Sequence, residues 1–229
     1  KQSRWMGWEV PQHKLTHQDL WKMSDKRTSF IIKATYDALP TPANKNIWFN
    51  TSEFTCKLCG EAGTLAHILN DCSVALKQGR FTWRHDKVLQ VIAEELETRR
   101  KEANKAPRKK RREIVFVKGG EKPTQKAARD WEMRADLGRP RLAIPTNIAV
   151  TAQRPDIIIY SHKTRKIGMI ELTVPKEERI QLSSEIKKMK YADLQDECRR
   201  KGYEPRLWTV EVGSKGFMAA SMMSMLKDH

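Results

Sequence analysis

Four potential metal ligands lie within seventeen residues of this chain, in the order Cys56-x2-Cys59-x7-His67-x4-Cys72. The short spacing of the first pair lets both thiolates reach one ion from a tight turn, which Gly60 favours. His67 and Cys72 are five residues apart, near one helical turn, so both can point back to the same centre. Three thiolates and one imidazole complete a tetrahedral Zn²⁺ site without an open position, which predicts structural zinc. The alternative is a group of buried free thiols beside a core histidine.

Positive charge is the second constraint. The 229 residues include 44 Lys+Arg and 28 Asp+Glu, a formal net charge of +16, which predicts a polyanionic partner, most commonly nucleic acid. No apolar stretch approaches the length of a membrane span, so we expect no membrane partner. The clustered cysteines and the lack of an apolar signal segment argue against a secreted disulfide framework. Because the chain begins with Lys, we expect it to be a piece of a longer protein.

The charge is concentrated between Arg99 and Lys126, where twelve Lys/Arg stand against three Glu. We interpret 104–112 as a solvated linker; a nuclear localisation signal or a phosphate-binding strap are the alternatives. It separates a helical region (1–50) and a Cys/His module with its following helix (51–103) from a third region (113–229). The residues of this block that we expect to bind DNA are Arg108, Lys109, Lys110, Arg111 and Arg112, and we expect the protein to act in the nucleus.

Hydrophobic periodicity predicts an α/β fold after the linker and helices before it. The N-terminal region reads as a helix with Trp21, Phe30, Ile31, Ala34 and Leu39 on one face, and a further helix carries Val88, Ile92 and Leu96. In the third region the expected elements are a strand at 114–117, a helix at 124–136, strands at 157–160 and 167–174, a helix at about 176–200, a strand at 207–212 and a Met-rich terminal helix.

The two central strands carry the most informative acids. If they pair symmetrically about the turn between Lys163 and Thr164, Asp156 lies directly opposite Glu171. Opposed residues of an antiparallel pair project to the same side, with Cβ atoms roughly 5 Å apart. A divalent cation such as Mg²⁺ or Mn²⁺ would convert this carboxylate repulsion into binding. The alternative is structural: Asp156 begins a strand, and Glu171 pairs with Lys163 or Lys166 at an edge.

The helix after the hairpin carries a lysine on its otherwise sheet-facing side. Lys187 and Tyr191 share this side with Ile180, Ser184, Leu194 and Cys198. Lys187 either extends to solvent or meets a buried acid, and Asp156 and Glu171 are the candidate partners. Two acids and a lysine around a metal ion suit phosphodiester hydrolysis, in which the metal neutralises the phosphate and the ammonium stabilises developing charge.

Pro155-Asp156-x14-Glu171 resembles the core of the PD-(D/E)xK restriction-like nucleases. Together with the upstream CCHC zinc knuckle, it is similar to the C-terminal region of non-LTR (LINE-type) retrotransposon proteins that carry a restriction-like endonuclease. The resemblance covers nearly the whole chain, including 36–44, 83–89, 171–175 and 210–217. It implies a restriction-endonuclease-like mixed β-sheet flanked by helices, and an enzyme that nicks target DNA so that the 3′ hydroxyl primes reverse transcription.

The resemblance also implies the roles of individual residues. Asp156 and Glu171 would bind the catalytic metal. Thr173 stands where the simple motif has lysine, and in this group the lysine is displaced to a Lys-x3-Tyr pattern that Lys187 and Tyr191 match. Lys190 is a less suitable substitute because it lies about 60° further round the helix. Asp136 would add an acid near the site, and Arg154 would contact DNA.

The expected partners are target DNA, the element's RNA and an upstream reverse transcriptase domain of the same polypeptide, because no Tyr/Phe-x-Asp-Asp motif occurs here. Trp5, Trp8, Trp48 and Trp83 would either stack on bases or lie in the core. Two other functions stay open. One is a catalytically inactive DNA/RNA-binding module, such as a domesticated retrotransposon remnant. The other is a zinc-stabilised interaction domain of a larger complex.

Overall fold

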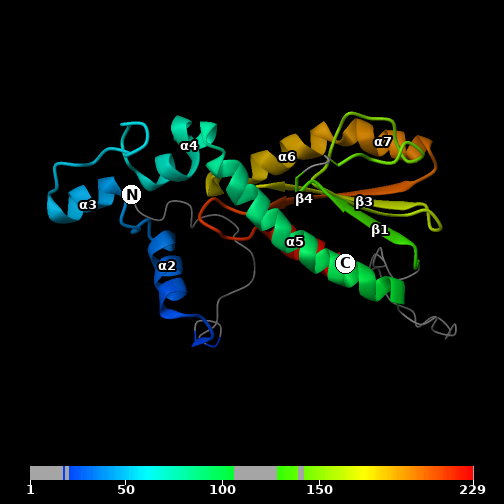
Figure 1. Cartoon of the computed structure of the whole chain (residues 1–229), viewed down its shortest axis with the longest axis horizontal. Helices are drawn as coiled ribbons and strands as arrows, with labels where there is room; N and C mark the ends of the chain where they lie inside the picture. Colours follow the sequence, from blue (N-terminus) through cyan, green and yellow to red (C-terminus); the bar gives the residue numbers. More distant parts are fainter. Residues whose placement is uncertain (1–17, 19–20, 106–127, 139–141, 229) are drawn as a thin grey trace. The chain divides into compact units, whose positions relative to one another are not determined.

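The computed structural model describes residues 18, 21–105, 128–138 and 142–228 (Figure 1). The chain forms two compact units that alternate along the sequence. Unit 1 contains Lys1–His85, Thr173–Ser183 and Glu211–Ala220, and unit 2 contains Asp86–Leu172, Ser184–Val210 and Ser221–His229. The sequence suggests four consecutive regions, with boundaries after 50, 103 and 112, whereas each unit is built from several separate segments. The four regions stay predictions.

Short helices dominate unit 1. They are α2 (Asp25–Thr35), α3 (Pro42–Phe49), the π-helix η2 (His67–Asp71) and α4 (Ser73–Lys77). The start of helix α3 has a local cause: Pro42 occupies its first turn, and the Thr41 side chain accepts a hydrogen bond from the backbone N–H of Asn44. The predicted N-terminal helix is shorter than expected: Ala34 is buried, whereas Phe30 and Trp21 are exposed.

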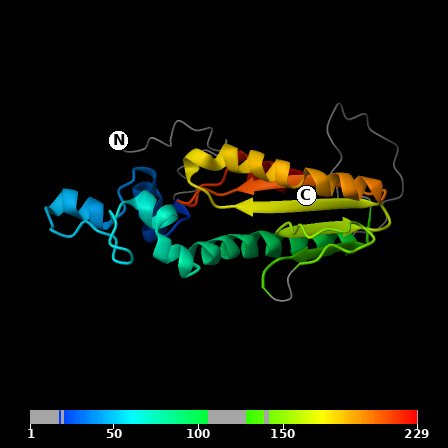
Figure 2. The ribbon, with the colours of Figure 1, turned by 90° about the horizontal axis from the view of Figure 1, so that it is seen from above.

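A four-stranded sheet carries the α/β part of the chain, in the order β1-β2-β3-β4. The strands are β1 (Trp131–Ala135), β2 (Ile157–Ser161), β3 (Lys166–Thr173) and β4 (Glu204–Glu211). The first three are antiparallel. The Glu204 N–H donates to the Arg165 carbonyl at one end of the pair, and the Val212 N–H donates to the Thr173 carbonyl at the other. Residue numbers therefore rise in the same direction on both strands, so β4 is parallel to β3 (Figure 2). The predicted fold class, a mixed sheet flanked by helices, is confirmed.

The crossover between β3 and β4 is helical and covers one face of the sheet (Figure 1). It consists of the 3-10 turn η3 (Glu177–Arg179), α6 (Ile180–Lys190) and α7 (Ala192–Arg200). The sequence predicts one helix here, but the structure divides it at Tyr191. The buried cluster beneath contains Tyr191, Leu194 and Cys198 from the crossover and Ile158, Tyr160, Ile167 and Met169 from the strands.

Two further helices complete the described structure: α5 (Arg80–Lys105) and α8 (Ala220–Asp228). Helix α5 buries Leu89, Ile92 and Leu96, close to the predicted apolar positions. Its C-terminal half is hydrogen bonded to β1: Arg100 and Asn104 both donate to the carbonyl of Trp131. Within the described ranges, no helix is both long and apolar enough to cross a membrane.

One predicted element is wrong. The sequence predicts a helix over 124–136, but Trp131–Ala135 form strand β1, paired with β2 from Trp131 opposite Ser161 to Ala135 opposite Ile157. Burial alternates along this segment, with Trp131 inside and Glu132 and Arg134 exposed, which is the period of a strand and not of a helix. The strand predicted at 114–117 lies outside the described residues.

Candidate active site and metal centre

The register of the β2–β3 hairpin is the one predicted from its turn. Tyr160 pairs with Ile167, Ile158 with Met169 and Ile157 with Ile170. The same register places Asp156, directly before β2, across from Glu171. The Asp156 carboxylate also holds the neighbouring strand, because its Oδ2 accepts a hydrogen bond of 2.7 Å from the backbone N–H of Leu172. The two acids therefore lie on the same side of the sheet.

Glu171 is a buried charged group, with 3 % of its surface exposed, and it meets three donors from the crossover helices. The Lys187 ammonium forms an ion pair and hydrogen bond with Oε1. The Tyr191 hydroxyl donates to Oε2 over 2.7 Å. Lys190 lies 3.6 Å from Oε1 and also donates to the Tyr191 hydroxyl over 2.8 Å. A buried carboxylate needs such partners to remain charged.

The backbone of the crossover explains how these side chains arrive at one carboxylate. Lys187 and Tyr191 are four residues apart, and the Tyr191 N–H donates to the Lys187 carbonyl over 3.2 Å, so they share one helix face. Tyr191 is fully buried, and its hydroxyl also lies 2.8 Å from the carbonyl oxygen of Arg154. Ser184, one turn before Lys187, is hydrogen bonded to Thr209 of β4, which fixes α6 along the sheet.

The electrostatics of the site favour a protonated phenol next to charged carboxylates. Burial raises the pKa of Tyr191 well above its ordinary value, and the negative charges of Glu171 and Asp156 raise it further. The phenol therefore acts as a hydrogen-bond donor at any physiological pH. The lysine side chains lie closer to solvent, with 26 % of Lys187 and 45 % of Lys190 exposed. Solvent therefore reaches Lys187, Lys190 and part of Asp156, whereas the Glu171 carboxylate is buried.

Lys190 is the contact that sequence reasoning undervalued. In an ideal helix Lys190 points away from the sheet. Its four-carbon side chain is nevertheless long enough to bring the ammonium group back to Glu171. Asp136 lies next to Asp156, because its backbone N–H donates to the Asp156 carbonyl; its Oδ1 accepts from the Leu142 N–H, and a role for it at the site stays a prediction. The contact of Arg154 with DNA stays a prediction.

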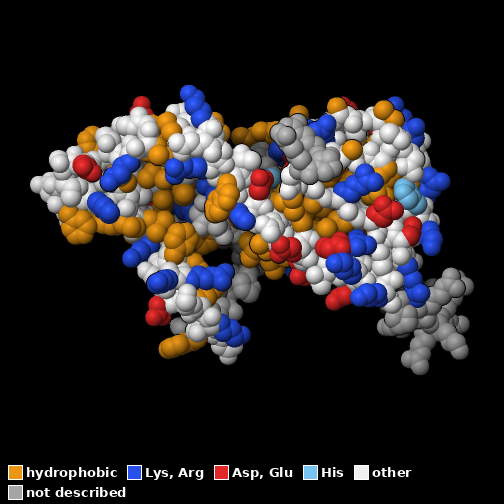
Figure 3. All heavy atoms as spheres, in the orientation of Figure 1, with side chains coloured by type: hydrophobic (Ala, Val, Ile, Leu, Met, Phe, Trp, Pro, Cys, Tyr) orange, Lys and Arg blue, Asp and Glu red, His pale blue; other side chains and the backbone are white. Residues whose placement is uncertain are grey.

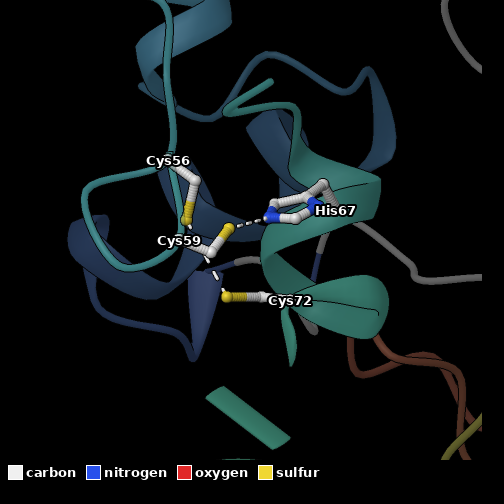
Figure 4. Close-up of side chains that lie close together, drawn as sticks. All are labelled: Cys56, Cys59, His67 and Cys72. Atoms are coloured by element: carbon white, nitrogen blue, oxygen red, sulfur yellow. Dashed lines mark hydrogen bonds between the residues drawn. The ribbon is translucent and has the colours of Figure 1, made fainter. Parts of the chain in front are cut away.

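The four Cys/His residues come together in unit 1, as the spacing predicts (Figure 4). The ligand atoms of Cys56, Cys59, His67 and Cys72 all lie within 4.8 Å of one another, near enough for a single metal ion. Cys56 Sγ is 3.9 Å from Cys72 Sγ, and Cys59 Sγ is 3.0 Å from His67 Nε2. The five-residue interval between His67 and Cys72 is spanned by the π-helix η2, in which the Cys72 N–H bonds to the His67 carbonyl.

A tight turn presents the first two thiols. Thr55 and Ala62 form a β-bridge, and the Gly60 N–H donates to the Cys56 carbonyl over 2.8 Å. Gly60 has φ of +81°, the left-handed conformation that glycine adopts without strain. Backbone N–H groups of Leu58 and Cys59 hydrogen bond to the Cys56 sulfur and lower the pKa of its thiol to about 6. Such a turn stabilises thiolate, the form that binds metal.

The predicted nucleic-acid contacts include residues outside the described ranges and two exposed tryptophans. Arg108, Lys109, Lys110, Arg111 and Arg112, and also Trp5 and Trp8, lie outside the described residues. Trp48 and Trp83 are exposed and are not core residues. Trp48 belongs to a group of hydrophobic side chains at the surface of α3, together with Ile47 and Phe49 (Figure 3).

In comparisons with known proteins, neither the family models nor the curated proteins gave a match to this chain.

Proposed function

We propose that this chain is a metal-dependent DNA endonuclease of the PD-(D/E)xK type, with a zinc knuckle for nucleic-acid binding. The observation that carries this proposal is the arrangement around Glu171. A buried carboxylate opposite Asp156 is contacted by Lys187 and Tyr191, which both come from the helical crossover. Burying an ionised acid with a lysine is costly, and sites of catalysis are where such arrangements are concentrated.

The donor set fits a hard divalent cation. Asp156 and Glu171 offer carboxylate oxygens from paired positions on one side of the sheet, and Mg²⁺ and Mn²⁺ prefer such ligands. The metal, when bound, would neutralise the scissile phosphate and make water a better nucleophile. The hydrogen bond from Leu172 N–H orients the Asp156 carboxylate, and the phenol of Tyr191 orients that of Glu171. Both acids are thereby held for ligation by groups of this chain.

Lys187 is proposed as the catalytic cation. Its ammonium reaches the same carboxylate from the solvent side, which allows it to contact a phosphate oxygen as negative charge develops there. Tyr191 has a positioning role, because it is fully buried and hydrogen bonds to Glu171. Lys190, which is closer to solvent, would strengthen the attraction for the DNA backbone.

The Cys3His cluster is proposed to hold structural Zn²⁺. All four ligand atoms converge, three thiols are soft ligands, and the set leaves no position open for substrate. The zinc module and the basic block would then hold nucleic acid while the carboxylate site cuts it. The net charge of +16 supports such binding through phosphate contacts, which makes it sensitive to salt.

The resemblance to LINE-type retrotransposon proteins supplies the proposed biological setting. The nick would prime reverse transcription of the element's RNA in the nucleus, and the reverse transcriptase would be an upstream domain of the same polypeptide. The features that support this setting are the combination of a CCHC cluster with the acid–acid–lysine site and the order of the two along the chain.

Nicking of supercoiled plasmid with Mg²⁺ or Mn²⁺ tests the enzyme directly. Wild type should convert the plasmid to the relaxed form, while Asp156→Ala and Lys187→Ala should not. Asp193→Ala and Lys188→Ala are matched controls, since both residues are exposed on the same crossover, and they should retain cleavage. Loss of cleavage in the controls, or equal cleavage by all variants, would contradict the assignment.

A catalytically inactive DNA- or RNA-binding module is the second candidate. It is favoured by the ion pair of Glu171 with Lys187, which also satisfies the acid without a metal ion. In that case all the proteins would bind DNA with the same dependence on salt, and none would cut it in either metal.

A further inference from the structure

The Glu171 carboxylate, the candidate metal ligand, is already paired with positive charge from α6. The Lys187 ammonium is paired with Oε1, and Lys190 Nζ lies 3.6 Å from the same oxygen. The other oxygen, Oε2, accepts the hydrogen bond of Tyr191. A carboxylate has about four lone-pair sites, so these three donors use most of the binding capacity of Glu171. The cation that compensates this buried acid is therefore supplied by the chain itself.

A divalent ion bound at Glu171 would meet the same ammonium. The two oxygens of one carboxylate are close neighbours, so a metal ion on either of them would lie within a few ångströms of Lys187 Nζ. Positive charges at that separation repel each other strongly, even near a protein surface. The metal and the ammonium therefore compete for Glu171. The phenol of Tyr191 adds no such repulsion, because burial and the neighbouring carboxylates raise its pKa and keep it neutral.

The contacts of Glu171 differ in how easily they can be broken. Tyr191 is fully buried, and its hydroxyl also donates to the Arg154 carbonyl, so the phenol is held in place. The side chain of Lys187 is 26 % exposed and that of Lys190 is 45 % exposed. Rotation about the bonds of these long side chains can bring either ammonium into solvent while the backbone of α6 stays where it is. The ammonium groups are therefore the replaceable partners of Glu171.

We infer that Lys187, assisted by Lys190, is a built-in counter-ion that takes the place of the metal at Glu171 and is displaced when a divalent cation binds. This inference rests on the proposed function, because it takes Asp156 and Glu171 as the metal ligands. Before the metal binds, the ammonium compensates the buried carboxylate, which would otherwise be costly. Once displaced, it can contact a phosphate oxygen, which is the catalytic role proposed for it. Lys187 thus lowers the metal affinity of the site that it serves.

Binding of Mn²⁺ tests this inference without any cleavage. Electron paramagnetic resonance of free Mn²⁺ measures its affinity for the zinc-loaded protein in the absence of DNA. Lys187→Met removes the charge but keeps an unbranched side chain, so it should bind Mn²⁺ at least roughly tenfold more tightly than wild type. Lys187→Arg keeps the charge and should bind Mn²⁺ as weakly as wild type. Lys187→Met should nonetheless nick plasmid more slowly, because the catalytic cation is lost.

Two control variants separate this competition from general effects of charge. Lys188 is an exposed lysine on the same helix, so Lys188→Met removes the same charge from a solvated position. Because solvent and salt screen that charge, the Mn²⁺ affinity of Lys188→Met should stay within about twofold of wild type. Asp156→Asn should weaken Mn²⁺ binding, which assigns the measured ion to the candidate carboxylates. Circular dichroism checks that each variant keeps its helices.

A second measurement needs only wild type, so a folding defect of Lys187→Met cannot affect it. Acetylation of lysines by an activated ester, followed by mass spectrometry, reports how accessible each amine is. Lys187 should react slowly while it is paired with Glu171. Saturating Mn²⁺ should raise its rate of acetylation several-fold, because the displaced ammonium enters solvent. The rate of the exposed Lys188 should not change.

The inference is overturned if wild type and Lys187→Met bind Mn²⁺ equally, if neither protein binds it, or if bound Mn²⁺ leaves the acetylation rate of Lys187 unchanged. Failure of the enzyme proposal has a different signature. In that case Lys187→Met binds Mn²⁺ more tightly and Mn²⁺ makes Lys187 reactive in wild type, but no plasmid is nicked.

Discussion

The phenol of Tyr191 donates a hydrogen bond of 2.7 Å to the Glu171 carboxylate, and both side chains are buried against the sheet. The other oxygen of the same carboxylate is paired with Lys187, so a single acid connects β3 to both helices of the crossover. Glu171 is thus a structural centre as well as the candidate metal ligand. The contribution of each contact can be measured on its own, because each one comes from a different residue.

Tyr191→Phe removes the hydroxyl but keeps the ring in the core. We expect it to lower the free energy of unfolding by about 1–3 kcal/mol, because the buried Glu171 carboxylate loses a charge-assisted hydrogen bond. Urea denaturation at neutral pH measures this change. Tyr36→Phe, at an exposed position, should change stability by less than about 0.5 kcal/mol. Equal stability of Tyr191→Phe and wild type would mean that the contact with Glu171 contributes nothing.

Lys187 and Lys190 both approach Oε1 of Glu171, but Lys187 is more deeply inserted. If Lys187 is the catalytic cation, Lys187→Ala should slow plasmid nicking by roughly 10²–10³-fold, the usual effect of removing one preorganised charge-stabilising donor. Lys190→Ala should weaken DNA binding and slow saturated nicking less than tenfold. The opposite order of the two rates would transfer the catalytic role to Lys190.

The Cys/His cluster predicts one tightly bound zinc ion per chain. Elemental analysis of purified protein should find it, and Cys72→Ser should lose it because one of four converging ligands becomes a poor one. Cys198→Ala is the matched control, since Cys198 is also buried but lies in the core of the other unit. Prolonged chelation should lower the melting temperature of wild type. Zinc content that is equal in Cys72→Ser and wild type would disprove the site.

The Glu97–Arg100 ion pair on α5 gives stability a specific pH dependence. The hydrogen bond from the Arg100 guanidinium lowers the pKa of Glu97 below its ordinary value of 4.5. A lowered pKa stabilises the folded state above the unfolded pKa, and this contribution disappears as the pH falls through the folded value. Because the pair is partly exposed, the free energy of unfolding of wild type should be higher than that of Glu97→Gln by under about 1 kcal/mol at neutral pH. Urea unfolding in strong acid should show no difference between them.

The parts of the site that depend on local periodicity could be predicted from the sequence. A symmetric turn sets the hairpin register, which is why the residue spacing alone places Asp156 opposite Glu171. Cysteine and histidine spacing is local too, and it identified all four members of the cluster. The choice of Lys187 and Tyr191 relied on helix geometry over a single turn and on the family resemblance, and the structure brings both to Glu171.

Other features depend on tertiary context and could not be predicted. Strand β1 is only Trp131–Ala135, too short for its alternation to outweigh the helical pattern assigned to 124–136, and its partner strand decides the outcome. The crossover is predicted as one helix because no Gly or Pro interrupts it, yet it divides at Tyr191, which the core holds between the Arg154 carbonyl and Glu171. The contact of Lys190 with Glu171 could not be predicted either, because the position of a residue around a helix does not show how far its side chain extends.

The most direct test of the central claim is the rate of plasmid nicking at saturating Mn²⁺, measured for wild type and Asp156→Asn at equal DNA occupancy. The substitution keeps the size of the side chain and removes its charge, so it separates chemistry from folding and binding. If Asp156 and Glu171 form a metal-dependent nuclease site, wild type relaxes the plasmid and the asparagine variant is slower by at least roughly 100-fold. Equal rates for the two proteins, or no nicking by wild type while it binds the plasmid, would contradict the account.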